Sequence, residues 1–215
     1  MKKKLKILGI FCHPDDEVLA GWPIFQRDDV EKHLLILCDD FARKGHCRVQ
    51  ALLEVCKREN INLIGTMSED NNFYAIPTRR AENILADAIY RININISEAI
   101  EDIQPDYVFT HNPVGEYGHG SHRLTFELVS QHPEVKDIIF TDICEVSNHR
   151  SNNTIPRTII DAYYHSGFTI NENEQVLDMA FYERCFNTYQ KHRAWTWNKN
   201  PIQNCDLYHI RGCNG

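Results

Sequence analysis

The sequence has no apolar run long enough for a membrane-spanning helix, so no transmembrane segment is predicted. It also lacks an excess of basic residues, because 23 Lys and Arg stand against 30 Asp and Glu, for a formal net charge of -7. That balance argues against a nucleic-acid or anionic-membrane surface. There is no internal repeat, low-complexity segment or linker, so residues 1–215 are predicted to form a single domain.

The 8 cysteines include no Cys-x-x-Cys pair and no spacing typical of a disulfide framework. They are therefore expected to be reduced thiols of a cytoplasmic protein. The basic start, Lys2 to Lys4, is followed by a short apolar run that contains Lys6 and has no small-residue cleavage site after it. A secretory signal peptide is therefore not expected.

Apolar runs that alternate with helical patterns predict an α/β fold with a mostly parallel sheet and right-handed crossovers. The predicted strands cover Leu5–Phe11, Leu34–Leu37, Ile61–Gly65, Asp106–Thr110, Ile138–Ile143, Ile159–Tyr164 and Cys205–Ile210. The predicted helices cover Glu17–Gln26 with a kink or end at Pro23, Arg48–Glu59, Thr78–Gln104 in two pieces broken near Asn93 or Asn95, Leu124–Ser130, and Glu174–Lys191. The polar segments 66–77 and 147–158 are predicted to be loops.

A dense polar cluster spans Cys12 to Glu17, with the sequence Cys-His-Pro-Asp-Asp-Glu, directly after the first predicted strand. Burying several carboxylates side by side is costly unless a cation or hydrogen bonds compensate. His13 and Asp16 offer one nitrogen and one oxygen ligand, a set that suits zinc or ferrous iron, while Asp15 between them could serve as a base. The alternative is a solvated loop whose acidic residues cap the next helix.

A second cluster spans His111 to His122 and follows the fourth predicted strand. His119 and His122 are three residues apart, so one helical turn places both on the same face. Ligands of open α/β sheets bind outside the carboxyl ends of the strands, where the strand order reverses. If the first and fourth strands are neighbours at that reversal, the two clusters meet and together supply a metal site with open positions.

The two motifs resemble those of the PIG-L/LmbE-like family of zinc-dependent N-acetylglucosamine de-N-acetylases. That family has a His-Pro-Asp-Asp-Glu motif early in the chain and a Gly-His-x-x-His motif later, and both occur here in that order, as residues 13–17 and 118–122. Gly120 and Ser121 depart from the usual Pro-Asp between the two histidines. The resemblance implies a Rossmann-like three-layer sandwich with a mostly parallel twisted sheet and a metal site at the carboxyl ends of strands 1 and 4.

The resemblance also implies roles for seven residues: His13, Asp16 and His122 bind zinc, Asp15 and His119 perform the acid–base work, Tyr117 lies beside the substrate carbonyl, and Arg48 lies near the sugar. In this scheme Asp15 is the general base for metal-activated water, and His119 stabilises the oxyanion or donates a proton. The expected activity is removal of the N-acetyl group from a small-molecule N-acetylated sugar or glycoconjugate. A homo-oligomer is compatible with the same sequence.

Two other functional classes fit the same residues. A non-haem Fe(II) enzyme is one, because two histidines and a carboxylate also bind Fe²⁺, although such sites are usually built on antiparallel β-barrels. A non-catalytic metal- or sugar-binding module on the same fold is the other, and Asp15 argues against it because a binding module needs no base there. Specificity is expected to depend on the loops 66–77 and 147–158.

Overall fold

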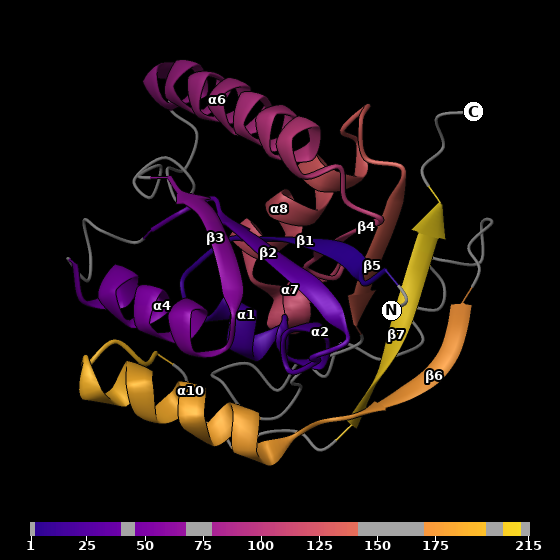
Figure 1. The fold of residues 1–215 in the computed structure, drawn as a ribbon. Coiled ribbons are helices and arrows are strands. Elements are labelled where there is room, and N and C mark those ends of the chain that lie inside the picture. The colour runs from indigo at the N-terminus through magenta and orange to yellow at the C-terminus, as the bar shows by residue number, and fades with distance from the viewer. Residues whose placement is uncertain (1–2, 40–45, 68–78, 142–169, 197–203, 212–215) are drawn as a thin grey trace.

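A computed structural model describes residues 3–39, 46–67, 79–141, 170–196 and 204–211 (Figure 1). The predicted loop over 147–158, the predicted strand over Ile159–Tyr164 and most of the predicted loop over 66–77 lie outside these residues. The strands are β1 (Leu5–Phe11), β2 (Val30–Ile36), β3 (Ile61–Thr66), β4 (Tyr107–Thr110), β5 (Asp137–Thr141), β6 (Ile170–Val176) and β7 (Asn204–Arg211). The helices are α1 (Asp16–Leu19), α2 (Trp22–Phe25), α4 (His46–Arg58), α6 (Arg79–Ile103), α7 (Gly115–Gly118), α8 (Gly120–Ser130) and α10 (Met179–Lys191).

The strands form one 7-stranded sheet in the order β3-β2-β1-β4-β5-β7-β6. The pairs among β1 to β5 are parallel, whereas β7 runs antiparallel to both β5 and β6. The predicted α/β class with a mostly parallel sheet is therefore confirmed. The strand order reverses between β1 and β4, which are hydrogen-bonded neighbours, so the segments that follow these two strands leave the sheet side by side.

Helices cover both faces of the sheet, which confirms the three-layer sandwich (Figure 1). Side chains alternate along β1 because successive residues of a strand point to opposite faces. Ile7 and Phe11 enter the hydrophobic core shared with α1, α2, α4 and α10. Leu8 and Ile10 enter the other core, shared with α6 and α8. A central strand that is apolar on both faces is what a covered parallel sheet requires.

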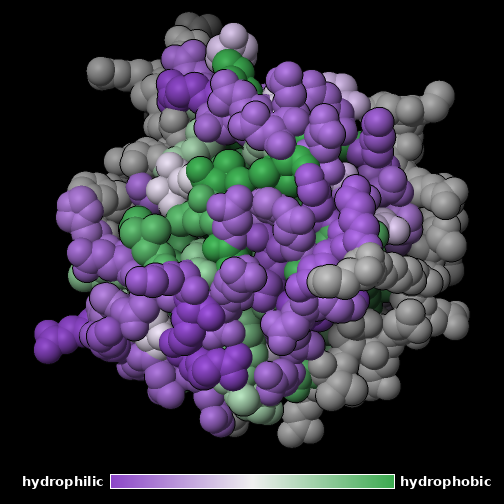
Figure 2. Space-filling view, viewed as in Figure 1, coloured by the Kyte–Doolittle hydropathy of each residue, from purple (hydrophilic) through white to green (hydrophobic). Residues whose placement is uncertain are grey.

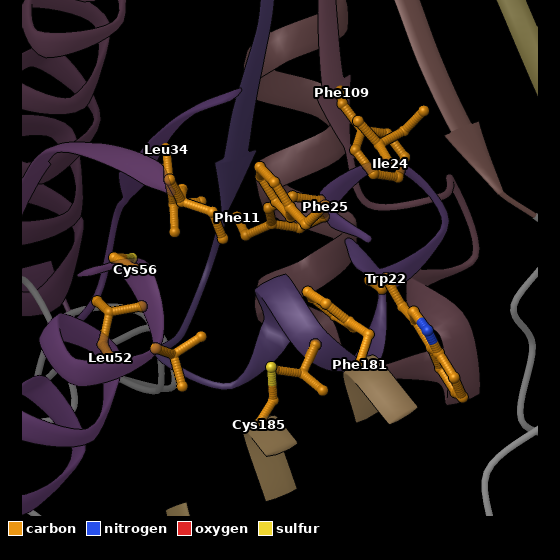
Figure 3. Close-up of a cluster of buried hydrophobic side chains, with 14 of the residues drawn as sticks. Phe11, Trp22, Ile24, Phe25, Leu34, Leu52, Cys56, Phe109, Phe181 and Cys185 are labelled. Carbon is orange, nitrogen blue, oxygen red and sulfur yellow. The ribbon is translucent and has the colours of Figure 1, made fainter. Parts of the chain in front are cut away.

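Gly9 lets an aromatic ring approach the sheet closely. A Cβ atom at this position would lie 2.5 Å from Cζ of Phe25, a ring that is fully buried. Figure 3 shows Phe25 beside Phe11 and Phe109, whose ring centroids lie 6.1 and 6.3 Å from its own. The absence of a side chain at Gly9 therefore allows α2 to pack tightly against β1.

The helix predicted over Glu17–Gln26, with a kink or end at Pro23, forms two short helices, and the break between them lies before Pro23. α1 ends at Leu19, and α2 begins at Trp22 with Pro23 in its first turn. Proline is tolerated there because the amide hydrogens of the first turn have no partner within the helix. Gly21 lies between the helices, and its missing side chain leaves room for the backbone carbonyl of Glu17, which a Cβ atom would meet at 2.6 Å.

The predicted break near Asn93 or Asn95 is wrong, because α6 is continuous from Arg79 to Ile103. Ile92 and Ile96 are fully buried on one face of the helix, whereas Ile94 is 38% exposed. The isoleucines at alternate positions 92, 94 and 96, which lie where the break was predicted, are therefore one exposed residue between two core residues. The Asn95 side chain is also accommodated, because its Nδ2 donates to the carbonyl oxygen of Arg91 at 2.8 Å.

The predicted helix over Glu174–Lys191 begins too early. Residues up to Val176 belong to β6, which pairs with β7, and α10 begins only at Met179. Asp178 is the N-cap, since its Oδ1 accepts a hydrogen bond from the backbone N–H of Ala180 at 2.9 Å. The first residues of the predicted helix form a strand instead, because β7 pairs with them and supplies hydrogen-bond partners for their backbone groups.

Hydrophilic residues dominate the face of the molecule drawn in Figure 2, with a hydrophobic area near its centre. Among the helices of the described residues, none has both the length and the apolar character needed to cross a bilayer.

Candidate metal centre

The two polar clusters meet at the carboxyl ends of β1 and β4. After β1 the chain forms a tight turn, in which the Asp16 backbone N–H donates to the carbonyl oxygen of His13 at 3.1 Å, and then enters α1. After β4 the chain passes through α7 and enters α8, which carries His122 in its first turn. Parallel pairing of β1 with β4 brings these segments together although about a hundred residues separate them in sequence.

His13, Asp16 and His122 converge on one point. Nδ1 of His13 and Nε2 of His122 each lie 3.4 Å from Oδ2 of Asp16, and the two nitrogens are 3.3 Å apart. Ligands at zinc-binding distance around a tetrahedral ion lie roughly 3.3–3.6 Å from one another. The three residues are also at most 5% exposed. The three atoms therefore have the spacing that three corners of a tetrahedral metal site require, and they could hold such an ion.

His111, Glu116 and His122 form a second group of possible ligands, but the distances favour hydrogen bonding. Oε2 of Glu116 lies 2.6 Å from Nδ1 of His122 and 3.0 Å from Nδ1 of His111. These separations are shorter than the spacing of two ligands around one metal ion and are typical of N–H···O bonds. Glu116 is therefore an acceptor for both imidazoles, and it supports the candidate metal site without entering it.

Asp15 adjoins the converging ligands in a strained backbone conformation, with φ 101°. Its Oδ1 accepts from Nη2 of Arg48 at 2.5 Å, and its Oδ2 accepts from the Thr196 hydroxyl at 2.6 Å. Burial raises the pKa of Asp15 to about 6, although the positive charge of Arg48 opposes that shift. A carboxylate with this pKa is suited to accept a proton near neutral pH.

Arg48 is in direct contact with Asp15 and is only 4% exposed. Its Nη2 donates both to Asp15 and to the carbonyl oxygen of Pro14. The structure therefore brings Arg48 to the site as a partner of the candidate base, and a contact with a sugar stays a prediction. The side chain of Tyr117 lies outside the described part of the structure, so its expected place beside the substrate also stays a prediction.

Two residues, one within α10 and one beyond its end, reach the same site and were not predicted from the sequence. The Tyr189 hydroxyl donates to Oε1 of Glu17 at 2.6 Å, and Oε2 of Glu17 accepts the backbone N–H of Asp15 at 2.9 Å. Thr196, a few residues beyond the helix, binds Asp15 directly. Neither residue follows a predicted strand or forms a motif, so no signal in the sequence connected them to residues 13–17.

His119 is half-buried at the start of α8, and its ring lies close to both candidate ligand histidines. The centroid distances are 5.3 Å to His13 and 4.3 Å to His122. Burial, together with the nearby imidazoles, lowers the pKa of His119 to about 3. Near neutral pH this ring is therefore a neutral imidazole whose N–H can donate a hydrogen bond.

Several solved structures share this fold. A deacetylase of the teicoplanin biosynthesis pathway is 12% identical with a TM-score of 0.64, and the match covers 98% of this chain and 100% of that one. N,N'-diacetylchitobiose deacetylase from Pyrococcus horikoshii is 17% identical with a TM-score of 0.53, covering 88% of this chain and 70% of that one. GalB, the 4-carboxy-2-hydroxymuconate hydratase from Pseudomonas putida, is 12% identical with a TM-score of 0.51, covering 96% of both chains.

At these identities the likeness establishes a shared fold, and the hydratase shows that the fold hosts more than one reaction. No curated protein matches the sequence. The PIG-L family, described as GlcNAc-PI de-N-acetylase, matches residues 8–132, a segment that begins within β1, ends just after α8 and contains both polar clusters. Since this match covers more than half of the 215 residues, the chain belongs to the PIG-L family.

Proposed function

We propose that this protein is a metal-dependent hydrolase that removes the N-acetyl group from an N-acetylated sugar of the GlcNAc type. The observation that carries the proposal is the convergence of His13, Asp16 and His122, with their metal-coordinating atoms 3.3–3.4 Å apart and the carboxylate of Asp15 beside them. Membership of a family described as de-N-acetylases supports the reaction. The two deacetylases with the same fold support it further.

His13, Asp16 and His122 would hold the metal ion, and Zn²⁺ suits this set of two nitrogens and one oxygen, with Fe²⁺ as the alternative. When bound, such an ion supplies a Lewis acid that polarises the amide carbonyl and makes water more acidic. Three protein ligands leave coordination positions open, which is typical of catalytic sites. All three ligands are buried, which restricts their positions.

Asp15 would accept a proton from the water molecule that attacks the amide carbon, and would then pass it to the nitrogen of the leaving amine. Arg48 and Thr196 hold its two oxygens, so the carboxylate is oriented before the substrate binds. His119 would donate a hydrogen bond to the carbonyl oxygen as negative charge develops there. Tyr117 beside the carbonyl and Arg48 near the sugar complete the proposed set.

We also propose that residues 1–215 form a single domain that works in the cytoplasm. Core residues come from both ends of the described chain, such as Ile7 and Cys205 in one cluster. The six cysteines of the described residues are free thiols, as expected in a reducing compartment.

Acetate release from a panel of N-acetyl sugars and glycoconjugates, together with metal analysis of the purified protein, tests the proposal. We expect about one metal ion per chain and acetate release from at least one substrate. Dialysis against a chelator should abolish release, and returning Zn²⁺ should restore it. Metal binding without acetate release from any amide substrate would overturn the deacetylase proposal. Uptake of oxygen by the Fe²⁺-loaded protein would instead support the non-haem iron alternative, and binding of sugars without turnover the binding module.

A further inference from the structure

Glu116 occupies a loop that is shaped around its side chain. Gly115 and Glu116 are both left-handed, with φ 67° and 54°, a conformation that is unfavourable for a residue with a Cβ atom. The side chain of Asn112 stabilises this loop, since its Oδ1 accepts the backbone N–H groups of Val114 and Glu116 at 3.1 and 3.0 Å. The loop thereby turns the carboxylate inward, where Glu116 is only 6% exposed.

The carboxylate of Glu116 accepts three hydrogen bonds and has no donor role. Oε1 accepts the backbone N–H of Asn112 at 3.1 Å, and Oε2 accepts from Nδ1 of both His111 and His122. Nε2 of His111 accepts the backbone N–H of Cys12 at 3.0 Å and lies 3.3 Å from Oδ2 of Asp16, and a nitrogen that accepts the amide N–H is itself unprotonated. His111 consequently carries its proton on Nδ1 and donates it to Glu116.

From these contacts we infer that Glu116 is the positioning residue that holds His122 in the Nδ1–H tautomer, so that its Nε2 is presented unprotonated toward His13 and Asp16. A metal ligand must offer a lone pair, and an imidazole with its proton on Nε2 could not coordinate there. This role rests on the proposed metal-dependent function, but it concerns the protonation of the ligand and not the reaction.

His111 also helps to hold the ring of His122 in this orientation. Its ring stacks on that of His122 with centroids 3.9 Å apart and an interplanar angle of 15°. Since His111 is anchored to the backbone of Cys12 at the end of β1, the chain of contacts from Cys12 through His111 and Glu116 joins the end of β1 to the imidazole of His122. The orientation of a ligand on α8 is thus tied to the strand that precedes the other two ligands.

The tautomer of His122 can be measured in the metal-free wild-type protein by ¹⁵N NMR of its imidazole nitrogens. We expect a protonated Nδ1 and an unprotonated Nε2. A population of His122 that is mainly protonated on Nε2 would overturn the inference, whether or not any variant folds. This measurement needs no substrate, so it is independent of whether the protein proves to be a deacetylase.

Two variants then test the effect on metal binding. Glu116→Gln keeps the size of the side chain, but one end of its amide is an NH2 group that cannot accept. This NH2 group must face either the Asn112 N–H or the two imidazole N–H groups, so one of these contacts is lost. Glu116→Gly removes the side chain and suits the positive φ. We expect the dissociation constant for Zn²⁺, measured by competition with a chelator, to rise about 10–100-fold in each.

Glu59→Gln is the matched control. The side chains of Glu59 and Glu116 are 8% and 7% exposed, and both are hydrogen-bonded, but Glu59 pairs with Arg58 and Arg184 far from the site. This control should lose stability without losing zinc affinity. Zinc affinity within threefold of wild type in both Glu116 variants, with their folds intact, would overturn the inference. If the affinity falls as expected but no substrate is deacetylated, the positioning role stands and only the proposed reaction fails.

Discussion

Gly9→Ala is a small change that the structure predicts to be harmful. The added methyl group would lie 2.5 Å from Cζ of Phe25 and 3.1 Å from Cε2 atoms of both Phe25 and Phe11. Ordinary van der Waals contact begins at 3.4 Å, so the Phe25 ring would have to move by about 0.9 Å (3.4 less 2.5). Phe25 is fully buried and packs against Phe11 and Phe109, so a shift of its ring would disturb these neighbours.

The expected loss combines two opposing effects. Overpacking a well-filled core costs about 1–3 kcal/mol. Replacing glycine by alanine restricts the unfolded chain and returns about 0.4–1 kcal/mol. We therefore expect the free energy of unfolding to fall by about 1–2 kcal/mol, which for a protein of this size lowers Tm by about 2–8 °C.

Urea unfolding followed by circular dichroism would measure this loss as a lower midpoint with an unchanged slope. Gly65→Ala in β3 is the matched control, because a Cβ atom there would meet nothing within 4 Å. It should leave stability unchanged or slightly raised. Repeating Gly9→Ala in a Phe25→Leu background tests the clash itself. Because the clashing ring is then absent, the loss of unfolding free energy should be smaller. Equal losses in both backgrounds, or an equal loss in Gly65→Ala, would refute the reasoning.

Three further predictions concern the site and the surface. Asp15→Asn should keep its bound metal and lose about 10²–10⁴-fold in turnover, as expected for a general base, whereas loss of the metal on dialysis would make Asp15 a ligand. His122→Ala should lose most of its zinc, because two remaining ligands hold it weakly, and full occupancy in dialysed protein would remove His122 from the ligand set. The pKa of the Glu59 carboxyl is lowered: burial alone would raise it, but hydrogen bonds from Arg184 and Arg58 outweigh that effect. Its contribution to stability should therefore be present above about pH 4.5 and vanish at lower pH, so the unfolding midpoints of wild type and Glu59→Gln should differ at pH 7 and converge in acid.

Much of the fold could be predicted because local patterns and tertiary packing agree. The strand over Leu5–Phe11 has its observed bounds, since a run that is apolar on both faces suits only a covered central strand. The break predicted in α6 fails because Ile94 is an exposed isoleucine, and no rule of spacing distinguishes it from its buried neighbours. The start of α10 fails because β6 depends on pairing with β7, which local propensity cannot reveal.

The candidate site could likewise be predicted only in part. The two motifs placed His13, Asp16 and His122 correctly as neighbours, because strand-end segments of parallel neighbours converge. Glu116 lies inside the second cluster, His111 to His122, and an acidic residue among these histidines was a signal that could have been used. Thr196 offered no such signal, because its contact with Asp15 spans 181 residues.

The contacts of Tyr189 with Glu17 and of Thr196 with Asp15 have a consequence for the order in which the protein matures during synthesis. The family match ends at residue 132, by which point all three candidate ligands have been translated. The candidate base, however, gains its hydroxyl partner only when Thr196 has left the ribosome. A nascent chain could therefore acquire its metal before both oxygens of its base are held, and full competence for chemistry should appear as one of the last events of folding.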